Sequence, residues 1–261
     1  MLLAADIGNA EITIGIFDED ALIYSFRLTS KTERTSDEFG IAMLVSLNNR
    51  GIDASDISAA IISSVVPDII HSFENALRKY FAVEALIVGP GIKTGLKIGA
   101  ENPKEVGAAL IAAAVAANHY YDSPAIIIDF STTTTYQYIS ADKTFEAAVI
   151  CPGIKIMANA IVENTAKLPE IEIKKPKSIM GKETISCIQA GIVYGTIGQA
   201  EYIVRRMKEE SKESKVCVIA TGGFGRIIAE ETDCIDIYDR ELTMKGLHLI
   251  YKMNTGMRKK V

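Results

Sequence analysis

The sequence predicts an α/β protein made of two similar domains, residues 1–118 and residues 119–261. Two stretches share one pattern: an apolar strand ends at an aspartate (Asp6 in the first, Asp129 in the second), and a polar turn, a second strand, an acidic turn and a third strand follow. Helices that alternate with strands come after each stretch, which indicates mixed β-sheets. Such an internal duplication predicts two like lobes that face each other across a cleft.

The composition is that of an ordinary globular protein, with 48% hydrophobic and 23% charged residues among 261. A formal net charge of −5 argues against nucleic acid or an anionic membrane as the main partner. The first residues lack the basic segment of a signal peptide, and no apolar run reaches the ~18 residues of a membrane span, so we expect a cytoplasmic protein. The 4 cysteines form no C-x-x-C pair and are expected to be small core residues in a reducing compartment.

The N-terminal half is predicted to contain a three-strand meander followed by alternating helices and strands. Thr35-Ser36-Asp37-Glu38 is an N-cap cluster, which begins a helix that ends near Asn48. Pro67 suits the first position of the next helix, which ends near Phe81. The elements are strands in 1–29, a helix in 35–48, a strand in 59–65, a helix in 67–81, a strand in 85–88 and, after Gly89-Pro90-Gly91, an alanine-rich helix from Asn102-Pro103 to Tyr120.

The C-terminal half repeats this plan. Residues 125–150 are the second meander, and Pro152-Gly153 leads into a helix from about Lys155. The remaining elements are a surface connection in 168–181 with Pro169 and Pro176, a long helix in 183–208, a strand in 216–220 and a final helix after Leu242.

The turn after Asp6 is the first candidate for phosphate chemistry. Gly8 and Asn9 tolerate positive φ, so the turn can present backbone N–H groups to an anion. An aspartate there can hold a metal ion, or a water bound to that ion, beside phosphates. A plain hairpin with an Asx turn is the alternative interpretation.

Two further turns strengthen the nucleotide hypothesis. Asp129 is followed closely by four consecutive threonines, and Thr132 can donate hydrogen bonds to a phosphate; β propensity alone explains Thr133 and Thr135 equally well. Thr221-Gly222-Gly223 ends an apolar strand, and its glycines allow the backbone to approach a flat ring such as adenine.

Other motifs cover the chain from Leu2 to about Lys252. They are Ile61-Ile62-Ser63-Ser64-Val65-Val66-Pro67, Val88-Gly89-Pro90-Gly91-Ile92-Lys93-Thr94-Gly95-Leu96, Asn102-Pro103-Lys104-Glu105-Val106-Gly107-Ala108, Pro152-Gly153-Ile154 and Thr221-Gly222-Gly223. With these motifs the sequence resembles the type III pantothenate kinases, of the superfamily of acetate and sugar kinases, Hsc70 and actin. The resemblance implies two duplicated ribonuclease-H-like (actin-like ATPase) domains around a nucleotide cleft.

The resemblance also implies an activity and a set of site residues. The family transfers the γ-phosphoryl group of ATP to pantothenate, the first step of coenzyme A biosynthesis, with Mg²⁺ and a monovalent cation (K⁺ or NH₄⁺), as a dimer that binds pantothenate at the subunit interface. The site residues that the resemblance implies are Asp6, Gly8, Asn9 and Thr13 of the ATP-phosphate loop, Thr132, Thr221, Gly222 and Gly223 for the nucleotide, Asp129 and Asp6 for metal ions, and Gly107 and Thr184 for pantothenate. Of these, Asp6, Gly8, Asn9, Asp129, Thr132 and Thr184 match the family in residue type.

The departures from the family pattern concentrate at the substrate site. The family motif G-A-D-R supplies a catalytic aspartate and a pantothenate-binding arginine, and these positions are Ala109 and Leu110 here. A positioned general base contributes roughly 10²–10⁴ to the rate, and an arginine bonded to a substrate carboxylate about 1.5–3 kcal/mol. The other departures are Ala100 for a tyrosine, Ala10 for a hydroxyl residue, Ser131 for a glycine and Ala147-Ala148 for two glycines.

Three functional hypotheses follow. The leading one is a family subunit that is catalytically deficient alone and works in a heteromeric kinase with an intact paralogue, to whose site it donates Thr184. The alternative is a non-enzymatic protein that senses a nucleotide or a coenzyme A metabolite. The third is a self-sufficient kinase with displaced groups; Glu105, four residues before Ala109, is expected on the same helix face but one turn of about 5–6 Å away.

Overall fold

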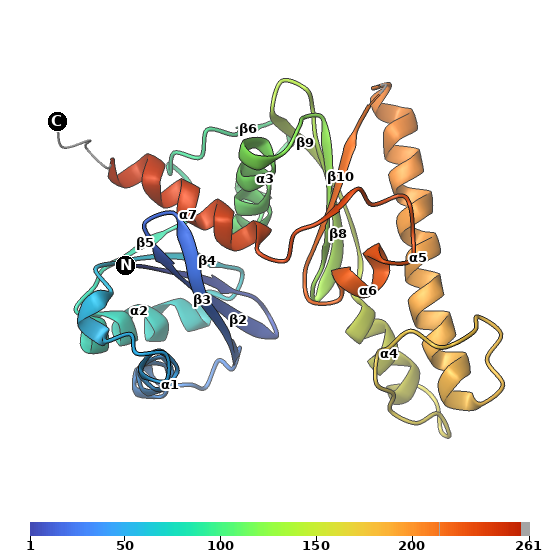
Figure 1. The fold of residues 1–261 in the computed structure, drawn as a ribbon, viewed down its shortest axis with the longest axis horizontal. Helices are drawn as coiled ribbons and strands as arrows, with labels where there is room; N and C mark the ends of the chain where they lie inside the picture. The colour runs from blue at the N-terminus through green and yellow to red at the C-terminus, as the bar shows by residue number, and fades with distance from the viewer. Residues whose placement is uncertain (214, 257–261) are drawn as a thin grey trace. The chain divides into compact units, whose positions relative to one another are not determined.

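The computed structural model describes residues 1–213 and 215–256. The chain folds into two compact units (Figure 1). Of the described residues, unit 1 contains 1–96, 102–116 and 242–256, and unit 2 contains 97–101, 117–213 and 215–241.

Unit 1 is built on a five-stranded mixed sheet with the order β3-β2-β1-β4-β5. The pairs β1–β2 and β2–β3 are antiparallel, whereas β4 is parallel to both β1 and β5. The strands are β1 (Leu2–Ile7), β2 (Glu11–Asp18), β3 (Ala21–Thr29), β4 (Ala59–Ser64) and β5 (Ala85–Ile87). The predicted three-strand meander is therefore confirmed.

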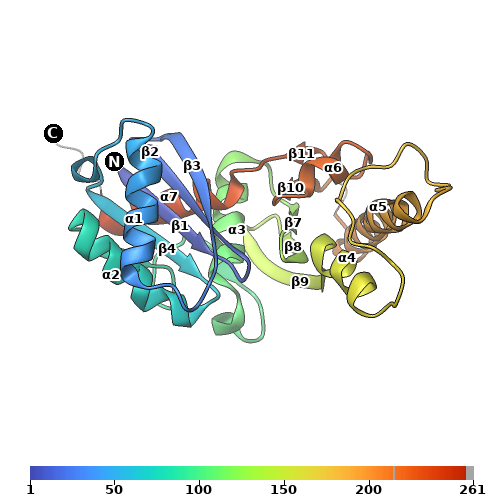
Figure 2. The ribbon, with the colours of Figure 1, turned by 90° about the horizontal axis from the view of Figure 1, so that it is seen from below.

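Helices cover both faces of this sheet, as Figure 2 shows. Alternate residues of β1 point to opposite faces, so that Leu3 and Ala5 pack under α1 (Ser36–Asn48) and α2 (Pro67–Phe81). Leu2 and Ala4 face the other way, into a second cluster with α3 (Ala108–Tyr120) and α7 (Leu242–Thr255).

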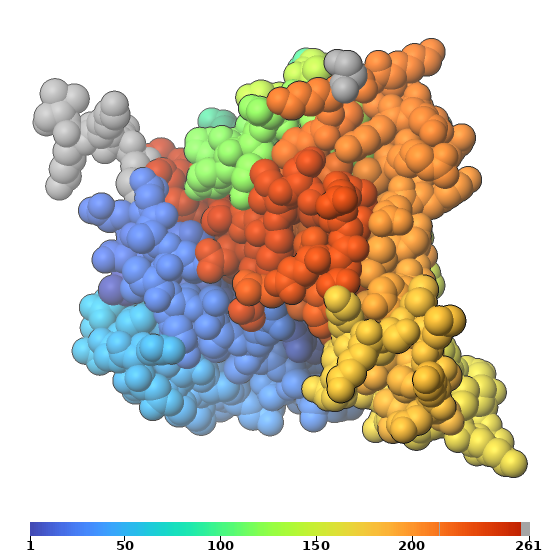
Figure 3. Space-filling view, turned by 45° about the vertical axis from the view of Figure 1, so that its right-hand side comes forward, coloured from blue at the N-terminus to red at the C-terminus, as the bar shows by residue number. Residues whose placement is uncertain are grey.

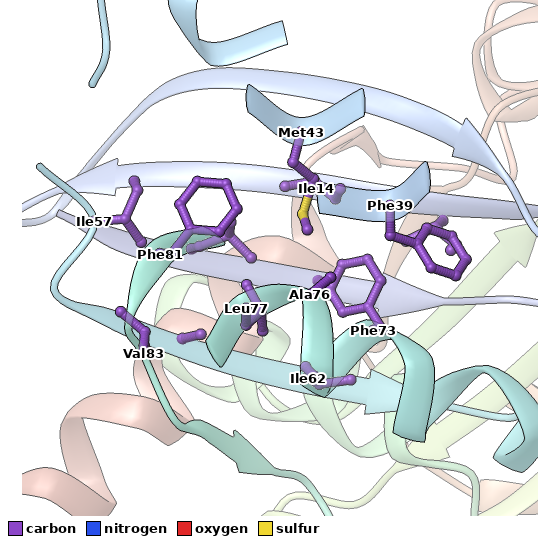
Figure 4. Close-up of a cluster of buried hydrophobic side chains, with 14 of the residues drawn as sticks. Ile14, Phe39, Met43, Ile57, Ile62, Phe73, Ala76, Leu77, Phe81 and Val83 are labelled. Atoms are coloured by element: carbon purple, nitrogen blue, oxygen red, sulfur yellow. The ribbon is translucent and has the colours of Figure 1, made fainter. Parts of the chain in front are cut away.

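The cluster under α1 and α2 is closely packed and apolar (Figure 4). Phe39 of α1 and Phe73 of α2 are fully buried, and their rings meet edge to face with centroids 5.4 Å apart. Helix α1 begins where the sequence predicts it, because the Thr35 hydroxyl accepts from the Glu38 N–H and the Glu38 carboxylate accepts from the Thr35 N–H. Pro67 is the first residue of α2, also as predicted.

The C-terminal helix α7 belongs to unit 1, whereas the sequence-based division at residue 118 places it in the second domain. It packs on β1, β2 and β4, and Met244 and Leu247 are buried in the cluster with Leu2. Gly246 permits this packing, since a Cβ there would lie 1.8 Å from the Ala112 carbonyl oxygen.

The alanine-rich helix begins later than predicted. Pro103–Glu105 form a short 3₁₀ helix (η2), and Val106 is extended, so α3 starts at Ala108. The Asn102 side-chain amide donates to Glu105 Oε1 at 2.6 Å, which closes the short turn locally. The prediction that Glu105 shares a helix face with Ala109 is therefore wrong.

Unit 2 contains a six-stranded mixed sheet with the order β11-β10-β7-β8-β9-β6. Its strands are β6 (Lys97–Ile98), β7 (Ala125–Phe130), β8 (Thr133–Ile139), β9 (Thr144–Pro152), β10 (Cys217–Thr221) and β11 (Ile237–Tyr238). The reversed order β9-β8-β7-β10-β11 corresponds strand by strand to β3-β2-β1-β4-β5 of unit 1. This correspondence confirms the duplication that the sequence pattern predicts.

One face of the second sheet packs on helices. The cluster joins Ile126, Ile128 and Tyr136 of the sheet to buried residues of α4 (Ile154–Glu163) and α5 (Thr184–Ser211). A short helix, α6 (Gly225–Ala229), follows β10 and has no counterpart among the predicted elements. Cys187 is exposed and the other three cysteines are half-buried, so the prediction of core cysteines is wrong.

In the part of the chain that the structure describes, no helix combines the length and the apolar character needed to cross a membrane.

Candidate functional site

The carboxylate of Asp6 lies in a row of polar side chains across three strands of unit 1. Asp6 at the end of β1 is paired with Thr13 of β2 and with Ser63 of β4. Because paired residues in a sheet share a face, the three side chains are neighbours. The Ser63 hydroxyl, which is fully buried, donates a hydrogen bond to Asp6 Oδ1 at 2.6 Å.

Burial raises the pKa of the Asp6 carboxyl above its usual range, and the hydrogen bond from Ser63 opposes that shift. A carboxylate fixed in this way is suited to bind a cation or a water molecule bound to one, because either restores the solvation that burial removes.

The turn after Asp6 is short and closed by the backbone. The Gly8 N–H donates to the Glu11 carbonyl at 3.0 Å, and a Cβ on Gly8 would lie 3.1 Å from the same oxygen. Asn9 and Ala10 are exposed at the tip. The turn is tight and polar as predicted, but neither Gly8 nor Asn9 has a positive φ, and the Gly8 N–H is used within the turn. The expectation that Gly8 presents its N–H to an anion is therefore wrong.

Unit 2 repeats the row in the equivalent strands. Asp129 at the end of β7 is paired with Thr135 of β8 and with Thr221 of β10. Thr135 and Thr221 are buried. Each unit therefore has an aspartate between two hydroxyl side chains. The row lies where two neighbouring parallel strands end, β1 and β4 in unit 1 and β7 and β10 in unit 2.

Part of this second row has unused hydrogen-bonding capacity. Gln137, two residues after Thr135 on β8, is fully buried. Within the described residues, neither atom of its amide nor the Thr135 hydroxyl has a hydrogen-bond partner. Buried polar groups in native proteins are nearly always satisfied by protein or ordered water, so this row calls for solvent or a ligand beside it.

Two other segments of unit 2 pack against the Asp129 turn, which also has an internal hydrogen bond. The Ser131 hydroxyl donates to Asp129 Oδ1 at 2.5 Å. Gly222, with φ of 88°, packs so closely that a Cβ there would lie 2.5 Å from the same oxygen. Gly153 packs on the other side of the turn, where a Cβ would lie 2.1 Å from the Thr132 carbonyl oxygen. Gly222 of the 221–223 motif therefore allows a close approach, and here the close neighbour is the turn itself.

The positions expected to carry the base and the substrate clamp are apolar. Ala109 and Leu110 are in the first turn of α3, and both are half-buried. Gly107 comes just before this helix, and a Cβ added to it would lie 3.9 Å from both Leu110 and Val65. Glu105 is exposed on the preceding 3₁₀ helix and is held by Asn102. The side chains of Ala109 and Leu110 cannot accept the proton of a hydroxyl substrate.

Thr184 lies on a different element from the Asp129 turn, as the exposed first residue of α5. A groove of about 650 Å³ lies between residues 179–181 and a later part of this helix, from Cys187 to Gly195, and Thr184 is not among its lining residues. Ile179 and Met180 of the rim are 63% and 78% exposed, which is unusual for large apolar side chains. The surface of α5 is orange in Figure 3, next to the yellow segment that leads into it.

Comparisons with known proteins agree with this arrangement. The sequence model of type III pantothenate kinases matches residues 2–206. The type III pantothenate kinase of Agathobacter rectalis is 50% identical over 252 residues, and that of Bacillus cytotoxicus is 49% identical over 254 residues; both alignments cover 97% of each chain. The chain belongs to the type III pantothenate kinase family. The family resemblance indicated by the sequence motifs is confirmed.

The solved structures support the fold class of the family. A protein assigned as a 2-dehydro-3-deoxygalactonokinase of Sinorhizobium meliloti matches with a TM-score of 0.63 and 11% identity, over 100% of this chain and 99% of that one. At that identity the likeness concerns the fold alone. Together with the repeated strand order, it confirms two duplicated ribonuclease-H-like domains of the actin-like type.

The sequence of this type III pantothenate kinase-family chain indicates the two aspartates together with Thr13 and Thr221, but it does not single out Ser63 or Thr135. Ser63 stands out in it only as part of a family motif, and β propensity explains Thr135 equally well. A signal for Ser63 is nevertheless present, because it lies at the end of the strand that follows the first meander, and parallel neighbours end at one edge of a sheet.

Proposed function

We propose that this chain is a nucleotide-binding subunit of a pantothenate kinase, deficient in catalysis alone and active in a heteromer with an intact family chain. The observation that carries the proposal is the contrast between retained and lost groups. Both aspartate rows keep their hydroxyl partners, whereas Ala109 and Leu110 replace the base and the substrate clamp of the family. Family membership supports pantothenate phosphorylation as the reaction in which the chain takes part.

The residues that we propose for nucleotide contacts are, in unit 1, Asp6, Gly8, Asn9 and Thr13. In unit 2 they are Thr132, Thr221, Gly222 and Gly223. In each turn the proposed phosphate donors are backbone N–H groups other than those of Gly8 and Ser131, which are bonded within their own turns. Asp6 fits Mg²⁺, which usually keeps several waters and is held by one or two carboxylates together with substrate phosphates. When bound, Mg²⁺ neutralises charge on those phosphates. No cluster of three or more metal-binding side chains occurs among the described residues.

Asp129 is the proposed partner of a monovalent cation in family chains, and it fits that role poorly here. Its Oδ1 already accepts a short hydrogen bond from Ser131, and the Gly222 backbone lies against the same oxygen. We therefore include ATP and Mg²⁺ as ligands of this chain and do not include K⁺ or NH₄⁺.

The chain's contribution to catalysis is orientation. In the family reaction the substrate hydroxyl attacks the γ-phosphorus of ATP, and a carboxylate accepts the hydroxyl proton. This chain has a methyl group where that carboxylate is needed, so it can hold the nucleotide but cannot take the proton. Thr184 and Gly107 are the remaining proposed contacts to pantothenate, and neither has a group that could serve as the base.

The proposed partner is an intact family chain in a dimer with pantothenate at the subunit interface. The exposed Thr184 and the exposed apolar side chains of Ile179 and Met180, a few residues before it in the chain, support this proposal, because exposed apolar patches mark interaction surfaces. Thr184 then serves the partner's site, which keeps the aspartate and the arginine. We expect this complex in the cytoplasm, with neither nucleic acid nor membrane as a partner.

The test is co-expression with a family chain that carries the aspartate–arginine pair. The two chains should copurify, and Thr184→Ala in this chain alone should raise the KM for pantothenate about 2–10-fold, the effect of one lost hydrogen bond. Thr184→Ser, which keeps the hydroxyl, is the matched control and should leave KM near the parent value. Failure to copurify, or an unchanged KM with Thr184→Ala in the complex, contradicts the heteromer.

The second candidate is a sensor of a nucleotide or a coenzyme A metabolite. Retention of both phosphate-type turns without a base favours it over an independent kinase. It predicts that the isolated chain binds ATP or a coenzyme A metabolite and that no intact family chain copurifies with it.

A further inference from the structure

Ser131 puts a hydroxyl group directly on the Asp129 carboxylate. Its Oγ donates to Oδ1 at 2.5 Å, in the range of strong O–H···O⁻ bonds. The Ser131 N–H donates to the Thr133 carbonyl at 3.2 Å, which fixes the turn that carries the hydroxyl. Most side-chain hydrogen bonds go to water or backbone, so a serine committed to this carboxylate needs an explanation.

The backbone at Gly222 also lies close to the same carboxylate oxygen. A Cβ on Gly222 would lie 2.5 Å from Oδ1 and 2.6 Å from the Phe130 carbonyl carbon and oxygen. The Tyr238 hydroxyl donates to the Gly222 carbonyl at 3.0 Å and holds that backbone in position. Oδ1 therefore has a donor in contact and a fixed backbone segment beside it.

We propose that the Ser131 hydroxyl takes the place of a monovalent cation at Asp129, so that nucleotide binding by this chain does not depend on K⁺. The positive end of the O–H dipole lies against Oδ1 and stabilises the carboxylate without any ion. Ser131 thus determines the ion specificity of the turn. The inference rests on the proposed function only in taking a nucleotide as the ligand.

Ser131 has a second possible role, with the opposite effect on cation binding, and the experiment below distinguishes the two roles. A serine oxygen keeps lone pairs and can itself coordinate a cation. In that case Ser131 would add a ligand, and K⁺ would strengthen nucleotide binding in the parent chain. The two roles of Ser131 predict opposite changes when the hydroxyl is removed.

The experiment measures affinity for Mg²⁺ and a non-hydrolysable ATP analogue by calorimetry, in potassium chloride and in tetramethylammonium chloride at equal ionic strength. The full-length chain should bind equally in both salts. Ser131→Ala should bind about tenfold more tightly in potassium than in tetramethylammonium, as expected for replacing one hydrogen bond to a charged group. Ser131→Gly should behave like Ser131→Ala, and Ser131→Thr, the matched control with a hydroxyl, like the parent chain.

A second readout needs no nucleotide. Thallium(I), a K⁺ substitute observable by NMR, should show K⁺-displaceable binding to Ser131→Ala and none to the parent chain. Tighter nucleotide or thallium binding in the parent chain than in Ser131→Ala overturns the proposal, and so does the absence of any ion effect in both variants. If no chain binds nucleotide in either salt, the proposed nucleotide function fails, and the thallium result alone still decides the role of Ser131.

Discussion

The Ser63 hydroxyl donates a hydrogen bond to Asp6 Oδ1 at 2.6 Å, across the paired ends of β4 and β1. Ser63 is fully buried, so its hydroxyl has a fixed role in orienting this carboxylate. The contact links the turn after Asp6 to the neighbouring parallel strand β4. The sequence of the turn itself does not specify this link.

Removing that hydroxyl should weaken the binding of a Mg²⁺-bound nucleotide. Ser63→Ala is expected to reduce affinity about tenfold, because hydrogen bonds to charged groups contribute about 1.5–3 kcal/mol. Ser63→Thr keeps a donor and should retain most of the affinity. Calorimetric titration measures both variants, with Asp6→Asn as the reference for complete loss. Equal affinities for Ser63→Ala and the parent chain would remove Ser63 from the site.

Gly153 should be intolerant of any side chain. In Gly153→Ala the new Cβ would overlap the Thr132 carbonyl oxygen, 2.1 Å away, and push the Asp129 turn out of position. We expect a loss of about 1–3 kcal/mol of stability, as for other overpacked sites, together with weaker nucleotide binding. Gly89→Ala, where a Cβ meets nothing within 4 Å, is the matched control. Chemical denaturation and calorimetry check both, and a Gly153→Ala protein with unchanged stability and binding would contradict the packing described for this turn.

The aromatic contact in the core of unit 1 should dominate the stability of that unit (Figure 4). Phe73→Ala removes a fully buried ring that contacts Phe39 and is expected to cost about 3–5 kcal/mol. Ile23→Ala, at a position 47% exposed on β3, should change stability by about 0.5 kcal/mol or less. Urea unfolding followed by circular dichroism compares the two, and similar midpoints would show that the core is not packed as described.

Stability should fall on mild acidification because of His248. Its ring is stacked on Phe17 with centroids 4.6 Å apart, its Nε2 lies 2.9 Å from the Glu19 carbonyl oxygen, and burial lowers the pKa of the imidazole. The unfolded chain therefore binds a proton more readily, so this contribution is fully present above the ordinary histidine pKa of about 6.5 and is lost as the pH falls through the lowered folded pKa.

The variant His248→Phe tests this sign. It keeps a flat ring against Phe17 but cannot be protonated, so its stability relative to the parent chain should rise as the pH is lowered from about 7.5 to about 5. Unfolding free energies from urea titrations at both pH values give the comparison. A constant difference between the two proteins would exclude His248 as the titrating group.

Local chemistry explains why much of the fold is predictable from the sequence. The capping box of Thr35 and Glu38 and the proline at position 67 set the starts of α1 and α2, and both signals can be read from neighbouring residues alone. The duplicated meanders are also predictable, because each combines period-2 alternation with a polar turn.

The rest depends on contacts between distant segments. The pairing of Ser63 with Asp6, and of Thr135 and Thr221 with Asp129, requires the strand register, which a single sequence does not specify. Strands β6 and β11 have two residues each, too few for a periodic signal. The error at Glu105 arises from expecting one continuous helix where Val106 is extended, because the bond from Asn102 closes a separate short turn.

The most direct test of the account is the rate at which the purified chain alone forms 4'-phosphopantothenate from pantothenate and Mg²⁺-ATP. The account predicts a rate no higher than that of the Asp6→Asn variant, because Ala109 cannot accept the hydroxyl proton. Turnover near about 1 s⁻¹, the low end of ordinary enzymes, that disappears in Asp6→Asn would contradict it and would show that another group of this chain serves as the base.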